Sequence, residues 1–230
     1  MVYFTKTIFR GILMVAEDVK LIEYSKKVEC GNTLTHGIGA VLSLIAVAAM
    51  LMKAQDARSL VSAAVYGVSL MAVYVASTVY HGLKAGEAKR IARLVDHSMI
   101  PVLIAGTATP CALVSLFDVS MAHGVVVFSV AWGCAIFGIV SKLFFFEKLK
   151  AVTVTVYIVS CLVMICCAVP LLDQINKNAF YGLLAGNLVY LVGAAFCGLG
   201  IKRPALHVVF HLFVVAASAV HFTVIYMYVI

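Results

Sequence analysis

The segment Pro204–Phe222, PALHVVFHLFVVAASAVHF, runs for 19 residues without a single Asp, Glu, Lys or Arg. A hydrocarbon core of roughly 30 Å is crossed by about 20 apolar helical residues, so this segment predicts a membrane-spanning helix. Two of its imidazoles, His207 and His211, lie four residues apart near its start and hence on one helix face. Ionisable side chains inside a membrane are costly and usually functional, so this pair predicts a site.

The chain as a whole shares this apolar character. Of the 230 residues, 64% are hydrophobic and only 12% are charged, a balance that a soluble domain of this size does not need. The short connections between its apolar segments favour helices that run up and down across the bilayer, because lipid offers no partner to backbone polar groups. The apolar segments are 34–52, 60–81, 96–117, 121–141, 151–172, 178–200 and 205–230.

We therefore expect an all-α integral membrane protein, multi-pass in the cell (plasma or inner) membrane. Residues 33–230 are expected to form a single domain, a bundle of seven transmembrane helices. Residues 1–32 differ, because their apolar side chains are spaced by three and four, a pattern typical of an amphipathic helix that lies in the membrane interface. This apolar stripe consists of Phe4, Ile8, Ile12, Val15, Val19 and Ile22.

The basic residues predict the orientation. Fourteen lysines and arginines lie in the N-terminal segment and in the connections after the second, fourth and sixth apolar segments, whereas Lys53, Arg58 and Lys177 lie on the other face. The positive-inside rule then puts the N-terminus in the cytoplasm and, with seven spans, the C-terminus outside. The net charge of +7 is thereby explained by topology, and we expect no nucleic-acid partner.

The same topology gathers polar side chains at the cytoplasmic boundary of the bundle. The second segment ends there, the third and seventh begin there, and Ser77 precedes His81 by one helical turn. Charge counting took no account of these residues, so their convergence is independent support for one site. The residues concerned are His36, Ser77, His81, Asp96, His97, His207 and His211.

A metal site is the interpretation that this cluster favours. His81, His207 and His211 bring three imidazoles from two helices, which with a water molecule is the ligand set of a catalytic zinc. Imidazoles also bind copper, iron or nickel, so residue types alone do not fix the metal. His123 and His221 fall toward the outer half of the bundle and are interpreted as structural residues.

Four short motifs carry a resemblance to a known family. They are ECGNTLTHGIG (with Glu29, Asn32 and His36), ASTVYH (Ser77 and His81), LVDHSMIPVLIAGTATP (from Leu94, with Asp96) and KRPALHVVFH (His207 and His211). Together they resemble the haemolysin III family, and through it the progestin and adipoQ receptors (adiponectin receptor-like proteins) and the alkaline ceramidases. This chain departs from the family pattern in TATP, where an aromatic residue is usual, and in VVFH, where a tryptophan often precedes the last histidine.

The resemblance implies a seven-helix bundle with a cytoplasmic N-terminus and a zinc ion held by His81, His207 and His211. It also implies that Asp96 and Ser77 lie near the water on that metal. The expected chemistry is hydrolysis of a lipid amide or ester, with a ceramide-like membrane lipid as the substrate that the relatives suggest.

Each of these roles has an alternative. Asp96 is a candidate general base or a group that orients the water, but a salt bridge to Arg93 or Lys89, or a bond to a ligating imidazole, is the structural alternative. Ser77 is a candidate hydrogen-bond donor to the water or to a developing oxyanion. Glu29, Asn32 and His36 are expected to brace the site, the alternative being a helix N-cap at Asn32 and interfacial polar residues.

The protein as a whole also has alternatives. A membrane sensor or homeostasis protein with a structural zinc would fill all four metal positions, with Asp96 as the fourth ligand. A cytolytic protein of the haemolysin type would need a soluble phase or a polar lumen, which seven apolar segments with tiny outer loops do not favour.

Overall fold

The computed structural model describes the backbone of residues 2–230 and the side chains of residues 10–149 and 151–230. Regular structure in this range is helical, and seven of the described helices are long and apolar enough to span a membrane. The helices are α1 (Val2–Asp18), α2 (Lys26–Lys53), α3 (Ala57–Gly82), α4 (Glu87–Pro110), η1 (Cys111–Leu116), α5 (Met121–Phe144), α6 (Lys150–Ala168), η2 (Val169–Leu171), α7 (Lys177–Gly200) and α8 (Leu206–Tyr228).

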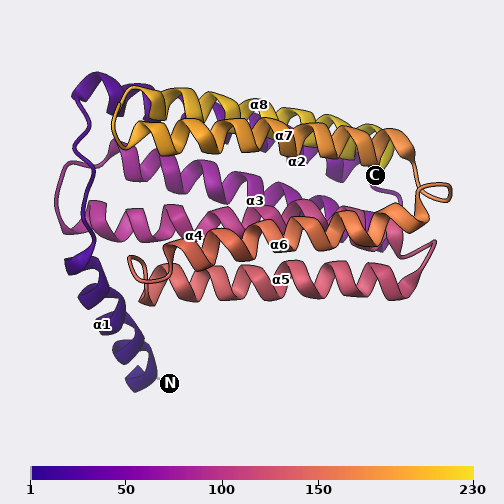
Figure 1. The fold of residues 1–230 in the computed structure, drawn as a ribbon, viewed down its shortest axis with the longest axis horizontal. Helices are drawn as coiled ribbons and strands as arrows, with labels where there is room; N and C mark the ends of the chain where they lie inside the picture. The colour runs from indigo at the N-terminus through magenta and orange to yellow at the C-terminus, as the bar shows by residue number, and fades with distance from the viewer. Residues whose placement is uncertain (1) are drawn as a thin grey trace.

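The spanning helices correspond one to one with the seven predicted apolar segments, α4 and the π-helical turn η1 forming one continuous span. They lie side by side in an elongated bundle, and α1 extends away from one end of it (Figure 1). The prediction of an all-α, seven-helix membrane protein is confirmed.

The order of packing brings the ends of distant segments together. In the bundle, α3 packs between α2 and α4, α2 also contacts α8, and α8 pairs with α7, while α5 contacts α4 and α6. Met50 of α2, Tyr66 of α3 and Ile225 of α8 are fully buried in one apolar cluster, which holds these three helices in register. The C-terminal end of α3 therefore lies close to the beginning of α8.

Two spans begin eight or nine residues earlier than their apolar segments. Helix α2 starts at Lys26, where the Ser25 hydroxyl caps it by accepting a hydrogen bond from the Val28 amide at 3.4 Å. Asn32 is therefore not an N-cap but a fully buried residue inside α2. Helix α4 likewise starts at Glu87, whose charge is favourable in a first turn. Hydropathy marks only the stretch within the hydrocarbon, and both helices continue beyond it.

The N-terminal helix packs against the bundle through its apolar stripe. Ile12, Val15 and Val19 lie in a small cluster with Leu94 of α4 and Phe146, just after α5. The stripe residues Phe4 and Ile8 lie outside the described side chains. A connecting segment without regular secondary structure, residues 19–25, then leads from α1 along the end of the bundle to α2 (Figure 1).

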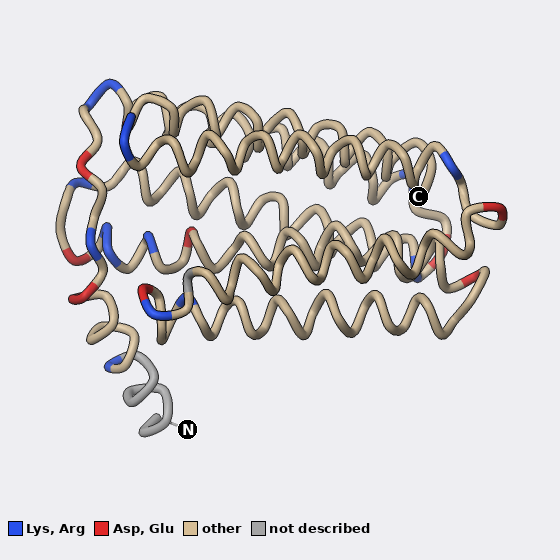
Figure 2. The backbone as a smooth tube through the Cα atoms, in the orientation of Figure 1, with Lys and Arg blue, Asp and Glu red and all other residues tan. Residues whose placement is uncertain are grey.

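Lysine and arginine gather at the end of the bundle where α2, α4 and α8 begin, and few lie at the opposite end (Figure 2). We call this the basic end. It is also the end at which α3 finishes, so His81 lies there together with His207 and His211 at the start of α8.

Candidate metal centre

Three imidazoles meet at the basic end. His81 comes from the last turn of α3, and His207 and His211 come from the first two turns of α8, four residues apart on one face. One ring nitrogen from each lies within 4.8 Å of the other two, close enough for one ion to bind all three after small side-chain movements. We call these residues the histidine triad, which is the group that the sequence predicted.

The orientation of the His81 ring is fixed by contacts at its Nδ1 atom. Its Nδ1 lies 2.7 Å from Glu29 Oε2 and 3.3 Å from Asn32 Nδ2, both on α2. Its Nε2 is buried and, among the residues that the structure describes, has no hydrogen-bond partner. A carboxylate on one nitrogen and an unpaired second nitrogen is the arrangement of a metal-ligating histidine, because the carboxylate fixes the tautomer and ring orientation.

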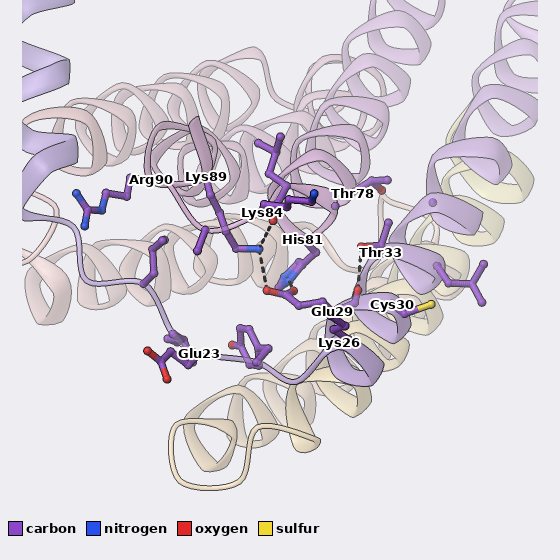
Figure 3. Close-up of a pocket in the computed structure, with 18 of the residues that line it drawn as sticks. Glu23, Lys26, Glu29, Cys30, Thr33, Thr78, His81, Lys84, Lys89 and Arg90 are labelled. Carbon is purple, nitrogen blue, oxygen red and sulfur yellow. Dashed lines mark hydrogen bonds and ion pairs between the residues drawn. The ribbon is translucent and has the colours of Figure 1, made fainter. Parts of the chain in front are cut away.

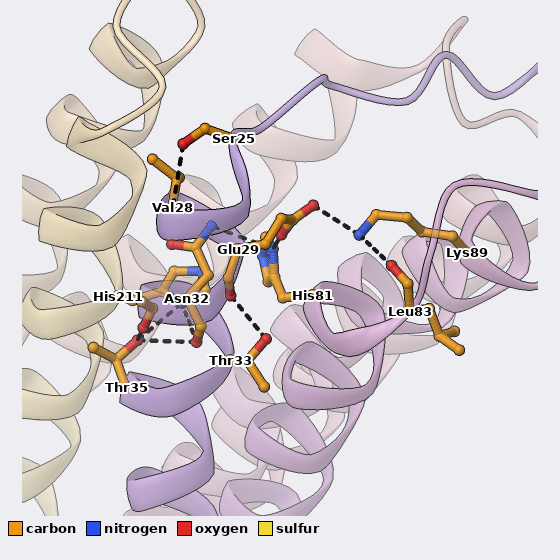
Figure 4. A network of polar contacts seen from close by, with 11 residues as sticks. Ser25, Val28, Glu29, Asn32, Thr33, Thr35, His81, Leu83, Lys89 and His211 are labelled. Carbon is orange, nitrogen blue, oxygen red and sulfur yellow. Dashed lines mark hydrogen bonds and ion pairs between the residues drawn. The ribbon is translucent and has the colours of Figure 1, made fainter.

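His211 is oriented in the same way by the backbone of α2. Its Nδ1 lies 3.3 Å from the Asn32 carbonyl oxygen and 3.4 Å from Thr35 Oγ1 (Figure 4). The Thr35 hydroxyl already donates to the carbonyls of Gly31 and Asn32, so the His211 Nδ1–H is the donor left for the Asn32 carbonyl. That tautomer leaves the Nε2 lone pair of His211 available to a metal.

His36 supports the triad without joining it. Its ring stacks on His211 with centroids 3.7 Å apart and planes 9° from parallel, and the edge of Tyr74 closes its other side at 5.1 Å. Both ring nitrogens of His36 are buried and lack a hydrogen-bond partner within the described part of the chain. The predicted bracing trio of Glu29, Asn32 and His36 thus lies around His81 and His211.

The negative charge of Glu29 is shared between two partners. While Oε2 contacts His81, Oε1 lies 2.7 Å from Nζ of Lys89, which is only 4% exposed and also donates to the Leu83 carbonyl at 2.9 Å. A buried ammonium needs such a carboxylate, since desolvation otherwise makes it expensive. Lys89 thereby fixes Glu29, and Glu29 fixes His81.

The connecting segment covers the triad. The Tyr24 ring stacks on His207 at 5.3 Å and tilts against His81 at 5.7 Å. Burial, helped by the nearby Tyr80 hydroxyl, raises the pKa of Tyr24, so its phenol remains neutral. The Arg93 guanidinium donates to the Lys20 carbonyl and so ties the segment to α4. The sequence analysis missed Tyr24, because no spacing rule relates a residue outside a helix to histidines on two others.

Asp96 and Ser77 form a second polar pair beside the triad. Asp96 is half-buried on α4, where the buried Ser77 of α3 and the charged Arg93 are near enough to influence its carboxyl group. Lys89, which we considered as an alternative partner of Asp96, is instead bound to Glu29. His97 turns elsewhere, with its ring edge-on to Phe146 at 5.1 Å.

Comparison with known proteins identifies the family of this chain. Residues 24–222 match the family model described as haemolysin-III related, and this range contains every residue of the site. Hemolysin-3 of Bacillus cereus is 36% identical over 94% of this chain and 98% of its own length, and the Hemolysin-3 homolog of Bacillus subtilis (strain 168) is 34% identical over 89% and 96%. The human monocyte to macrophage differentiation factor is 25% identical over 86% of this chain and 82% of its own. The chain therefore belongs to the haemolysin III family of integral membrane proteins.

Proposed function

We propose that this protein is a zinc-dependent hydrolase that cleaves an amide or ester bond of a membrane lipid, with ceramidase-like chemistry and a role in lipid homeostasis. The observation that carries the proposal is the histidine triad, whose three imidazoles leave His81 Nε2 buried and without a partner among the described residues. Three imidazoles with an open fourth position are the ligands of a catalytic zinc.

The position of the triad supports a lipid substrate. It lies at one end of a bundle whose outer surface carries exposed apolar side chains such as Leu44, Ile136 and Leu188. A substrate that reaches it from the bilayer would have its polar head at the basic end. The excess of Lys and Arg at that end favours its placement at the cytoplasmic leaflet.

Zinc at the triad would polarise a lipid carbonyl and activate a water molecule for attack on it. Asp96 is suited to orient that water or to take its proton, and the neighbouring Ser77 to hold the carboxylate in place or to stabilise the oxyanion. Glu29 would keep the His81 ring in its ligating orientation. Tyr24 would exclude bulk water by covering two of the three imidazoles.

The test combines metal analysis with a lipid panel. Detergent-purified wild type, His81→Ala, Asp96→Asn and the control His123→Ala, whose ring bonds Ser120, would be assayed for bound zinc and for products from lipid amides and esters. We expect zinc near one per chain in all but His81→Ala, and product only from wild type and His123→Ala. A well-folded wild type without metal would contradict the proposal.

The names of the bacterial relatives suggest a second candidate function, membrane lysis. Release of haemoglobin from erythrocytes by wild type and Asp96→Asn alike would favour it over hydrolysis. Zinc retained in every variant except His81→Ala, without any product from the panel, would instead favour a membrane sensor with a structural zinc.

A further inference from the structure

A groove of about 1320 Å³ opens beside the triad. Its walls are the connecting segment, the first turns of α2, the end of α3 and the loop into α4. Glu29 and His81 form part of the wall, with Lys26, Lys84 and Arg90 on the elements around them (Figure 3). A space of this size exceeds the pocket of a typical small ligand and suits the upper part of a lipid.

One side of the groove is apolar and faces the bilayer. Leu34, Ile38 and Val41 follow one face of α2 and are 62%, 51% and 59% exposed. Between them, Gly37 leaves the gap to α3 open, since a Cβ there would lie 3.8 Å from Thr78 Cγ2 and meet nothing closer. A hydrocarbon chain can lie along this apolar face.

The other side of the groove carries cations in excess. Lys89 is neutralised by Glu29, but Lys26, Lys84 and Arg90 make no ion pair with any described residue. The Arg90 Nε is buried and likewise lacks a hydrogen-bond partner within the described range. The exposed Glu23 is the one further carboxylate along the described wall, so the polar end of the groove keeps a net positive charge.

We propose that this groove binds one anionic phosphodiester lipid, with its phosphate at the basic polar end and one acyl chain along Leu34, Ile38 and Val41. Basic pockets between transmembrane helices are known to select anionic headgroups. The carbonyl of such a lipid lies between its phosphate and its chain, which here is the level of His81. An uncharged lipid such as a ceramide would leave the cations of the groove without a negative charge to pair with. Hydrolysis of the bound lipid rests on the proposed function, whereas its binding in the groove does not.

Native mass spectrometry of the intact chain tests the binding. Protein released from micelles that contain phosphatidylglycerol, phosphatidylcholine and diacylglycerol in equal amounts should retain phosphatidylglycerol preferentially. In Lys84→Gln/Arg90→Gln we expect this preference to fall roughly tenfold or more, since each basic residue near a headgroup contributes substantially to binding. The control Lys27→Gln/Lys202→Gln removes two exposed cations of the same end outside the groove and should keep the preference.

A second pair of variants tests the apolar side. Gly37→Phe should fill the gap between α2 and α3 and reduce the adducts of all three lipids. Gly133→Phe adds the same ring to a position with no atom within 4 Å of a Cβ and should leave the adducts unchanged. Equal loss in both charge-removing variants, or unchanged adducts in Gly37→Phe, would overturn the groove as the binding site.

Hydrolysis by the same variants separates this inference from the proposed function. Selective binding of phosphatidylglycerol without any hydrolysis product would uphold the groove while contradicting the hydrolase. Products formed from uncharged lipids at equal rates by wild type and Lys84→Gln/Arg90→Gln would uphold the hydrolase and overturn the anionic selectivity.

Discussion

Helix α8 buries histidines at both of its ends, and the two surroundings differ. At the basic end, His211 meets the imidazoles of His81 and His207. At the other end, His221 is buried against α7, where its Nε2 lies 3.0 Å from the Leu183 carbonyl and its ring meets Tyr190 at 5.4 Å. We call this second cluster the His221 pocket. Within the described residues, His81 Nε2 in the triad and His221 Nδ1 in the His221 pocket are both buried ring nitrogens without a partner, as are the two ring nitrogens of His36 beside the triad.

An unpaired nitrogen therefore does not by itself make a metal site. Around His81 the other ligand nitrogens lie within 4.8 Å, and a carboxylate holds the ring from behind. His221 is instead fixed by one carbonyl and by packing on Gly186, where a Cβ would lie 2.2 Å from its Cδ2. The number of converging nitrogens, together with their bracing, distinguishes the candidate site from a structural histidine.

The sharpest test of this contrast is removal of the metal. A chelator should lower the Tm of wild type and of His221→Ala by about 10 °C, because an ion that binds only the folded state stabilises it by mass action. His81→Ala, which we expect to bind no metal, should show no chelator effect. Thermal unfolding in detergent, with and without chelator, measures this. A chelator effect that survives in His81→Ala would locate the metal elsewhere.

The bracing carboxylate gives the next largest effect. Glu29→Gln should lower zinc affinity by about 10- to 100-fold, because the amide cannot hold the His81 ring as a charged acceptor does. Glu23→Gln, which alters an exposed carboxylate of the connecting segment, is the matched control. Competition with a zinc-binding dye measures both affinities. Equal affinity in the two variants would mean that Glu29 serves only to pair Lys89.

Much of this site follows from the sequence because hydropathy and charge fix the depth of each residue. The apolar runs predict seven helices, the basic loops predict their direction, and both put His81, His207 and His211 at one end. Spacing by four then predicts a shared face for His207 and His211.

The depth of a residue in the membrane does not reveal how its helix is rotated about its axis. The contacts that the sequence did not predict depend on this rotation or on where a helix begins. Asp96 and His97 have nearly the same depth, yet successive helical residues point about 100° apart, so Asp96 meets Ser77 while His97 meets Phe146. Lys89 was expected in a loop, and only the extension of α4 to Glu87 brings it to Glu29.

The His221 pocket should respond to volume rather than to metal. Gly186→Ala forces a methyl group into the His221 ring and should destabilise the protein by about 1–3 kcal/mol, with zinc content unchanged. Gly133→Ala, which meets no atom within 4 Å, should gain up to about 1 kcal/mol from helix propensity. Unfolding in mixed micelles measures both changes. Loss of zinc from Gly186→Ala would show that the two ends of α8 are coupled.

The smallest expected effect probes that coupling most directly. The hydroxyls of Tyr190 and Ser218 lie 2.7 Å apart and share a hydrogen bond between α7 and α8. Tyr190→Phe should cost only about 0.6 kcal/mol, the average for interhelical hydrogen bonds in a membrane protein. The freed Ser218 hydroxyl can turn to the carbonyl one turn before it, which limits the cost further.

Tyr74 connects the middle of α8 with the surroundings of the triad. Its hydroxyl lies 3.4 Å from the Val214 carbonyl of α8, and its ring meets His36, which stacks on His211. If α8 is a rigid rod, Tyr190→Phe leaves zinc affinity as it is in wild type, and the two histidine clusters are energetically separate. A change in zinc affinity larger than the change in stability would instead require the polar side chains between them to transmit the effect. The triad and the His221 pocket would then be parts of one connected network rather than two independent clusters.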